Sequence, residues 1–244
     1  MVEKMIFLDF DGVLFNTVKE AYASAVISSN IYQSIDEIDF DSKHYADFLS
    51  YRYLLGPAWN YKYILEFLVE KDFLKHYKEK LKSVHKSEYE DFEIRFFETR
   101  EKLKKNDFQN WFSLNESYPF LDKIKPLLQR NKDLFCIVTT KDKATVTKLL
   151  QTEDIKIADN SIYDQKDFES YGNKADIINT IISDRNIDVS IFVDDSRKHL
   201  DICKQINNLQ LIQADWGYIA VDDIDVENVG EVVLKINNLI AGSK

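Results

Sequence analysis

Four short apolar runs, each followed by polar residues, constrain the fold of this chain more than any other feature of its sequence. They are rich in branched and aromatic residues and are shorter than ordinary helices, which is typical of buried strands. Helix-like segments follow the last three runs. Strands that alternate with helices predict an α/β fold with a parallel sheet and right-handed crossovers. The runs are residues 5–10, 134–140, 189–195 and 209–215.

Two further segments have the apolar spacing of amphipathic helices. Residues 119–131 place apolar side chains three and four positions apart, and Pro126 lies inside this segment, where a proline can kink a helix. Residues 173–183 show the same spacing, with Asn173 as a candidate N-cap. Both segments therefore predict helices that cover the sheet.

Residues 16–115 differ in character from the rest of the chain. They are helix-like, nearly balanced in charge and dense in Tyr, Phe and Trp, and they lack the alternation of sheet strands. We therefore expect a Rossmann-like core of residues 1–15 and 116–244, with a helical cap domain of residues 16–115 inserted after the first strand.

Polar side chains gather where the predicted strands end. In open α/β sheets, ligands bind outside the carboxyl ends of the strands. Carboxylates crowded in a partly buried site repel one another and are poorly solvated. A hard divalent cation relieves both problems, and magnesium prefers oxygen ligands. The residues are Asp9 and Asp11 after the first strand, Thr139 and Thr140 after the second, Asp194 and Asp195 at the end of the third, and Lys174 at the start of a predicted helix.

Five segments resemble, in the same order, the sequence motifs of the haloacid dehalogenase superfamily. The Asp-x-Asp pair after the first strand is the most specific of them, and the others gain specificity in combination. The resemblance covers the predicted core. The helical insertion after the first strand matches the first class of cap domain in this family. The segments are DFDGVLFNT at 9–17, VTTK at 138–141, GNKADII at 172–178, FVDDS at 192–196 and QADWGY at 213–218.

The resemblance implies a magnesium-dependent phosphotransferase with Asp9 as the nucleophile that forms an aspartyl-phosphate. Asp11 would protonate the leaving oxygen and later activate water. Thr139 would bind a phosphoryl oxygen, and Lys174 would neutralise negative charge. Family members that cleave carbon–halogen bonds or phosphonates generally lack the second acid, so Asp11 favours phosphate-ester chemistry.

The same resemblance implies a Mg²⁺ site. Asp9, Asp195 and the main-chain carbonyl of Asp11 would hold the ion, with Asp194 beside it. Many relatives carry a further acid four residues after the metal-binding Asp. His199 occupies that position here, so Asp194 is a candidate for the compensating acid.

Several assignments leave alternatives open. Asp9 and Asp11 could be turn residues before Gly12, and the acids at 194–195 could cap the next helix. Thr140 could serve in place of Thr139. Lys141 or Lys143 could serve in place of Lys174, because the Lys-Pro pair common in the family is replaced here by Lys174-Ala175.

Outside these motifs, the individual residues suggest ordinary structural roles. His44, His76, His85 and His199 show no metal-ligand spacing, and we expect surface or hydrogen-bonded side chains. Cys136 and Cys203 lie in apolar segments, and we expect buried, reduced thiols in a cytoplasmic protein. Arg52, among the aromatic residues of 51–63, could reach an anionic group of a substrate or be a solvated arginine on a packed helix.

Composition narrows the possible partners. The formal net charge of −10 argues against nucleic-acid binding, which needs a basic surface. No apolar stretch approaches the roughly 18 residues of a membrane span, and residues 1–15 lack the layout of a signal peptide. The favoured function is hydrolysis of a small phosphorylated metabolite. The alternatives are a phosphomutase of the same superfamily and a catalytically weak binding or regulatory protein.

Overall fold

A computed structural model describes residues 2–223 and 225–242, and the chain divides into two compact units. The first unit combines Met1–Asn16 with Glu116–Lys244, and the second is Thr17–Asn115. The first boundary lies one residue after the one expected from sequence, and the second lies at the expected position.

Six parallel strands form the sheet of the first unit, in the order β5-β4-β1-β6-β7-β8. The first strand of the chain therefore lies in the interior of the sheet, and the predicted Rossmann-like α/β core is confirmed. The edge strands β5 and β8 are not apparent in the sequence, because two residues carry no periodicity. The strands are β1 (Lys4–Leu8), β4 (Phe135–Val138), β5 (Ile162–Tyr163), β6 (Val189–Asp194), β7 (Leu209–Ala214) and β8 (Val226–Glu227).

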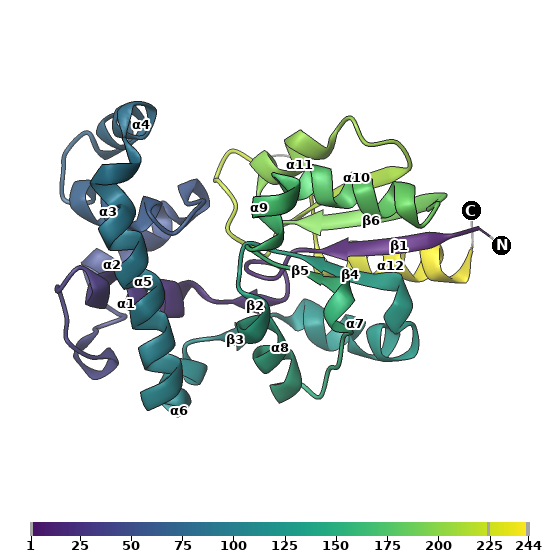
Figure 1. Cartoon of the computed structure of the whole chain (residues 1–244), viewed down its shortest axis with the longest axis horizontal. Coiled ribbons are helices and arrows are strands. Elements are labelled where there is room, and N and C mark those ends of the chain that lie inside the picture. The colour runs from purple at the N-terminus through teal and green to yellow at the C-terminus, as the bar shows by residue number, and fades with distance from the viewer. Residues whose placement is uncertain (1, 224, 243–244) are drawn as a thin grey trace. The chain divides into compact units, whose positions relative to one another are not determined.

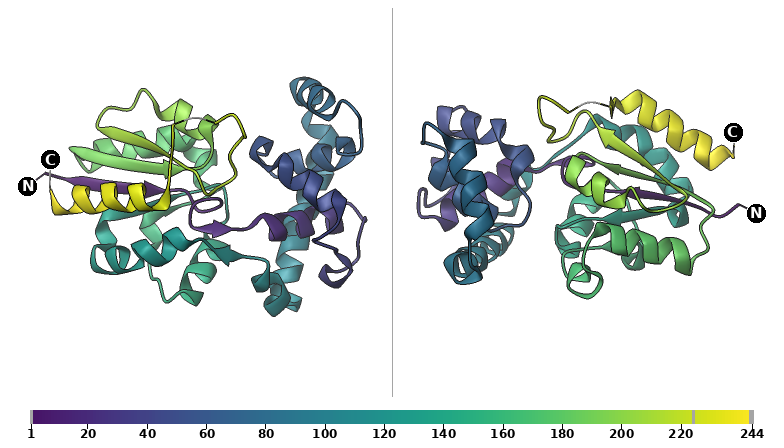
Figure 2. Two further views of the ribbon diagram at one scale, coloured as in Figure 1. Left: turned by 180° about the vertical axis from the view of Figure 1, so that it is seen from behind. Right: turned by 90° about the horizontal axis from the view of Figure 1, so that it is seen from above.

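Helices cover both faces of this sheet. Helices α9, α10 and α11 lie on one face, and α7, α8 and α12 lie on the other (Figure 1; further views in Figure 2). Helix α7 continues through Pro126, and Asn173 caps α10 by accepting the N–H of Asp176 at 3.2 Å. The helices are α7 (Pro119–Arg130), α8 (Lys143–Thr152), α9 (Asp167–Tyr171), α10 (Lys174–Asp184), α11 (Arg197–Cys203) and α12 (Val229–Ala241).

The core on the α10 face is continuous. Met5 and Phe7 of β1 pack in one cluster with buried isoleucines of α10, such as Ile177 and Ile181. Cys136 and Cys203 belong to the same cluster as free, buried thiols, as predicted. Burial of β1 on both faces explains why its sequence is an unbroken apolar run.

The second unit is a helical domain with an aromatic core. Tyr22, Phe48, Phe96 and Trp111 are fully or almost fully buried in it. No helix among the described residues is long and apolar enough to cross a membrane. The helices are α1 (Val18–Ser28), α2 (Lys43–Ser50), α3 (Asn60–Phe67), α4 (Phe73–Ser83), α5 (Lys86–Asn106) and α6 (Phe108–Ser113).

A buried ion pair joins α1 to α5 within this unit. Arg100 donates two hydrogen bonds to Glu20, of 2.7 and 3.0 Å, and Ser24 and Trp111 donate to the same carboxylate. Removing one partner of such a pair leaves an uncompensated buried charge, which typically costs about 3–5 kcal/mol. The pair therefore ties together helices that are far apart in the sequence.

A two-stranded antiparallel ribbon lies where the second unit is inserted. Strand β2 (Phe15–Asn16) pairs with β3 (Glu116–Ser117), and Asn16 is opposite Glu116. Opposite residues of an antiparallel pair have Cα atoms about 4.5–5.5 Å apart. The two ends of the insertion therefore lie close enough for a tight turn to join Asn16 directly to Glu116.

We expect the first unit to fold without residues 17–115. Joining Asn16 to Glu116 through an Asn-Gly turn preserves the ribbon, because this dipeptide favours the two-residue turns of hairpins. The shortened chain should keep α/β circular dichroism and unfold in one cooperative thermal transition. A shortened chain without a cooperative transition would show that the sheet unit depends on the insertion.

Candidate active site

The site begins at the carboxyl end of β1. This strand ends at Leu8, and the N–H of Asp9 donates to the carbonyl of Val193 at 2.9 Å, which extends the contact with β6. The Asp9 side chain is almost completely buried, and its Oδ1 accepts the N–H of Phe10 at 2.7 Å. Parallel pairing therefore brings Asp9 next to the acids at the end of β6.

Lys174 connects the two strand ends. Its Nζ lies 2.9 Å from Oδ2 of Asp9 and 2.7 Å from Oδ2 of Asp194. The lysine is the first residue of α10, and its side chain is only 1% exposed. Burial lowers the pKa of Lys174, but the carboxylates of Asp194 and Asp9 outweigh burial and raise that pKa above its ordinary value. Lys174 is thus a permanent buried cation.

The two acids on Lys174 differ in how well their charge is stabilised. Burial raises the pKa of Asp9 to about 6, although Lys174 opposes this shift. Burial also acts to raise the pKa of Asp194, but Lys174 and His199 hold it well below its usual range. Asp194 also accepts the N–H of Ser196 at 2.8 Å. Of the two, Asp9 is therefore the less stabilised carboxylate.

Two glycines enclose Asp195. A Cβ at Gly12 would lie 2.1 Å from Oδ2 of Asp195, and a Cβ at Gly217 would lie 2.3 Å from its Cβ. Gly12 also has a φ of +84°, which favours glycine. The Oδ2 atom of Asp195 accepts the N–H of Tyr218 at 2.6 Å. The acid is therefore held against the loop that carries Asp9 and Asp11.

The segment after β7 also forms hydrogen bonds with the loop that follows β1. Trp216 donates its indole N–H to the carbonyl of Val13 at 3.0 Å, and the Tyr218 hydroxyl donates to Oδ1 of Asn16 at 3.1 Å. The Trp216 ring also packs on Phe120 of α7. The QADWGY segment thus supports the backbone that follows the first acid pair.

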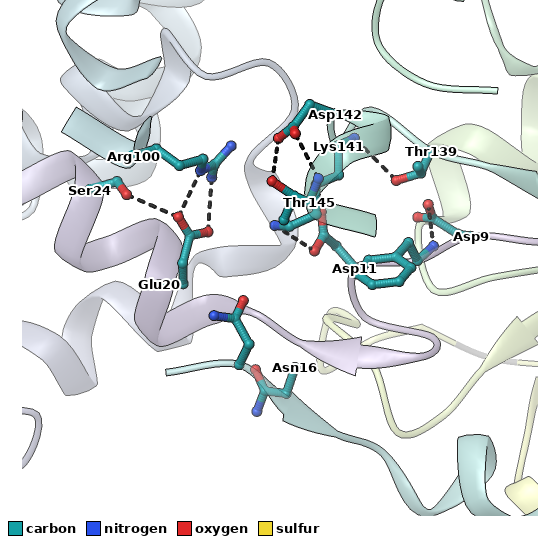
Figure 3. Close-up of polar contacts among 12 residues, drawn as sticks. Asp9, Asp11, Asn16, Glu20, Ser24, Arg100, Thr139, Lys141, Asp142 and Thr145 are labelled. Carbon is teal, nitrogen blue, oxygen red and sulfur yellow. Dashed lines mark hydrogen bonds and ion pairs between the residues drawn. The ribbon is translucent and has the colours of Figure 1, made fainter. Parts of the chain in front are cut away.

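A second buried lysine lies beside Asp11. The Nζ of Lys141 is 3.1 Å from Oδ1 of Asp11 (Figure 3), and the Lys141 side chain is only 1% exposed. Thr139 is buried and accepts the N–H of Lys141 at 3.2 Å, whereas Thr140 is exposed. Lys143 donates to the carbonyl of Asp159 on the protein surface instead.

The structure shows where the alternative residues lie. Lys141 and Lys174 are both buried, and each contacts a different acid of the first motif; the role expected of Lys174 stays a prediction. Of the two threonines, only Thr139 is buried beside the Lys141 turn. Arg52 belongs to the second unit, where its guanidinium carbon lies 5.9 Å from the centroid of the Tyr61 ring. Its contact with substrate stays a prediction.

A possible metal centre is formed by Asp9, Asp194 and His199, whose ligand atoms lie within 4.8 Å of one another. The Nδ1 atom of His199 is 3.2 Å from Oδ2 of Asp194. The spacing of the histidines gives no indication of this contact. The only signal in the sequence is that His199 stands where relatives of the superfamily carry an acid.

The charges of the site suit a divalent cation. The site holds four carboxylates but only two lysines, so negative charge is in excess when all are ionised; the acids are Asp9, Asp11, Asp194 and Asp195. The excess negative charge is poorly solvated, as the raised pKa of Asp9 indicates. Oxygen ligands of this kind suit Mg²⁺.

We expect Asp9→Asn to stabilise the metal-free protein at neutral pH. The folded state binds a proton at Asp9 more tightly than the unfolded state does, so this group lowers the free energy of unfolding as pH rises from about 4 to about 7. Relative to wild type, the variant should gain on the order of 2 kcal/mol across this range. Urea denaturation in the presence of a chelator, at several pH values, measures the difference.

Asp194→Asn is the matched control. The folded-state pKa of Asp194 is lowered, so its charge stabilises the fold above the unfolded-state pKa, and this variant should lose stability at neutral pH. The same pH dependence in both variants would contradict the assignment of Asp9 as the poorly stabilised acid.

Comparison with known proteins supports the fold. No family model and no curated protein matches the chain. Among solved structures, a predicted phosphatase from Clostridium acetobutylicum is 18% identical, with 98% of this chain and 100% of that chain covered and a TM-score of 0.60. A predicted phosphoglycolate phosphatase from Haemophilus somnus 129pt is 16% identical, with 96% and 98% covered and a TM-score of 0.58. A haloacid dehalogenase-like hydrolase from Streptococcus pneumoniae is 15% identical, with 96% and 98% covered and a TM-score of 0.52. The chain therefore has the haloacid dehalogenase-like fold.

Proposed function

We propose that this protein is a magnesium-dependent hydrolase of a small phosphomonoester, and that it works through an aspartyl-phosphate on Asp9. The observation that carries the proposal is the position of Asp9, a buried carboxylate beside a buried lysine. Asp11 lies two residues later on the same loop and is partly exposed. A nucleophile and a separate acid–base group are the two functions that this reaction needs.

Each residue has a role in the proposed reaction. The Asp9 carboxylate attacks phosphorus, and the bond from phosphorus to the leaving oxygen breaks. Asp11 gives its proton to that oxygen, and then takes a proton from the water that hydrolyses the aspartyl-phosphate. Thr139 donates a hydrogen bond to a phosphoryl oxygen. Lys174 balances the charge of Asp9 and of the phosphoryl group.

The proposed cofactor is Mg²⁺. Asp9, the main-chain carbonyl of Asp11, and Asp194 and Asp195 at the end of β6 would hold it. When bound, the ion supplies positive charge that offsets the repulsion between an anionic substrate and the carboxylates. The four acids supply the donor oxygens that such an ion requires.

We further propose that the second unit is a substrate-selecting cap. In this type of enzyme, a cap excludes water and contacts the part of the substrate that does not react. Arg52 is the candidate contact for an anionic group, because guanidinium pairs well with carboxylate or phosphate. The structural neighbours are described as phosphatases or hydrolases, which agrees with a small phosphorylated metabolite as the substrate.

The first test is phosphate release from p-nitrophenyl phosphate. We expect release that depends on Mg²⁺ and that falls to background in Asp9→Asn, because an amide is a far weaker nucleophile than a carboxylate. Lys143→Met is the matched control, since this lysine lies outside the site. Release that survives Asp9→Asn, or that does not respond to a chelator, would contradict the mechanism.

A further inference from the structure

We propose that Lys141 is a positioning residue that orients Asp11 toward the leaving oxygen of the substrate. This inference rests on the proposed function. The role differs from that of Lys174, which lies on Asp9 and Asp194. The proposed reaction uses no group at position 141, although burying a lysine is costly unless its charge is paired.

The backbone around Lys141 is held on both sides. Its N–H donates to Thr139 Oγ1 at 3.2 Å, and the next residue, Asp142, caps α8 by accepting the N–H of Thr145 at 2.8 Å. The ammonium group is therefore presented from a turn fixed between β4 and a helix start (Figure 3). Such a turn provides a rigid point of attachment for a second side chain.

Asp11 lies on the loop after the end of β1, where an isolated bridge pairs it with Phe15. Its side chain is 20% exposed, compared with 1% for Lys141, and its Oδ1 lies 3.1 Å from the ammonium. The lysine is thus buried in the protein interior, whereas the acid is partly exposed. This arrangement suits a group that must meet an incoming ester.

The chemistry gives this contact a specific consequence. Asp11 matters most when the leaving group is a basic alkoxide, because an alkoxide must receive a proton as the bond to phosphorus breaks. A nitrophenolate leaves readily without that proton. If Lys141 acts through Asp11, its loss must affect alkyl esters more than nitrophenyl esters. A purely structural role would affect both equally.

The experiment compares kcat/KM for benzyl phosphate and p-nitrophenyl phosphate, two compounds of similar size. Lys141→Met should lower kcat/KM for benzyl phosphate roughly 10–100-fold more than for p-nitrophenyl phosphate, since positioned proton transfer contributes on this order. Lys141→Arg, which keeps the charge, should restore most of the loss. Lys143→Met should leave both values unchanged.

A double variant tests whether Lys141 acts through Asp11. Asp11→Asn should show the same leaving-group dependence, and adding Lys141→Met to it should cost little more with benzyl phosphate, because residues that act as one unit are not additive. If Lys141→Met does not fold, Lys141→Gln takes its place in the same measurements. Melting temperature and Mg²⁺ affinity by calorimetry verify that each variant is intact.

Two results would overturn the inference. Equal losses with both esters, or additive losses in the double variant, would show that Lys141 does not act through Asp11. Wild-type protein that hydrolyses neither ester would instead contradict the proposed function, and the role of Lys141 would fall with it. The two failures are distinguishable because the second is visible before any variant is made.

Discussion

The contact between Lys174 and the carboxylates of Asp9 and Asp194 is the interaction on which the site depends. It joins the ends of two neighbouring strands to the start of a helix, and it lies where water cannot screen it. A lysine in this position needs a carboxylate partner, because burial alone would favour its neutral form, and Asp194 is the stronger of its two partners. The acids in turn need the lysine, and Asp9 remains incompletely stabilised even with it. This deficit agrees with the proposed role of Asp9 as the nucleophile.

Close backbone approach is the second constraint on the site. Gly12 and Gly217 allow two loops to lie against Asp195, and no larger residue fits at either position without displacing that acid. The loop after β7 then fastens the segment after Asp11 through Trp216 and Tyr218. The positions of the acids therefore depend on contacts between segments about 200 residues apart in the chain.

Much of the fold is predictable from local patterns. The apolar runs indicate the parallel strands, because strands buried on both faces carry continuous apolar sequence. Asn173 predicts the start of α10, because its side chain satisfies a free N–H there. The short strands β2, β3, β5 and β8 are not predictable in this way. Two residues have no period, and their pairing depends on which neighbours the rest of the fold supplies.

The sequence by itself determined the chemical content of the site: an Asp-x-Asp pair, an acidic pair, a threonine and candidate lysines, at the ends of predicted strands. Only the tertiary structure decided how they are paired. The sequence favours Lys174 and leaves Lys141 as an alternative for the same role, yet Lys141 contacts Asp11 whereas Lys174 contacts Asp9 and Asp194. His199 joins the acids although its spacing gives no sign of it. Spacing along the chain specifies which strand end or helix start a residue occupies, whereas strand order and helix packing determine which charges meet.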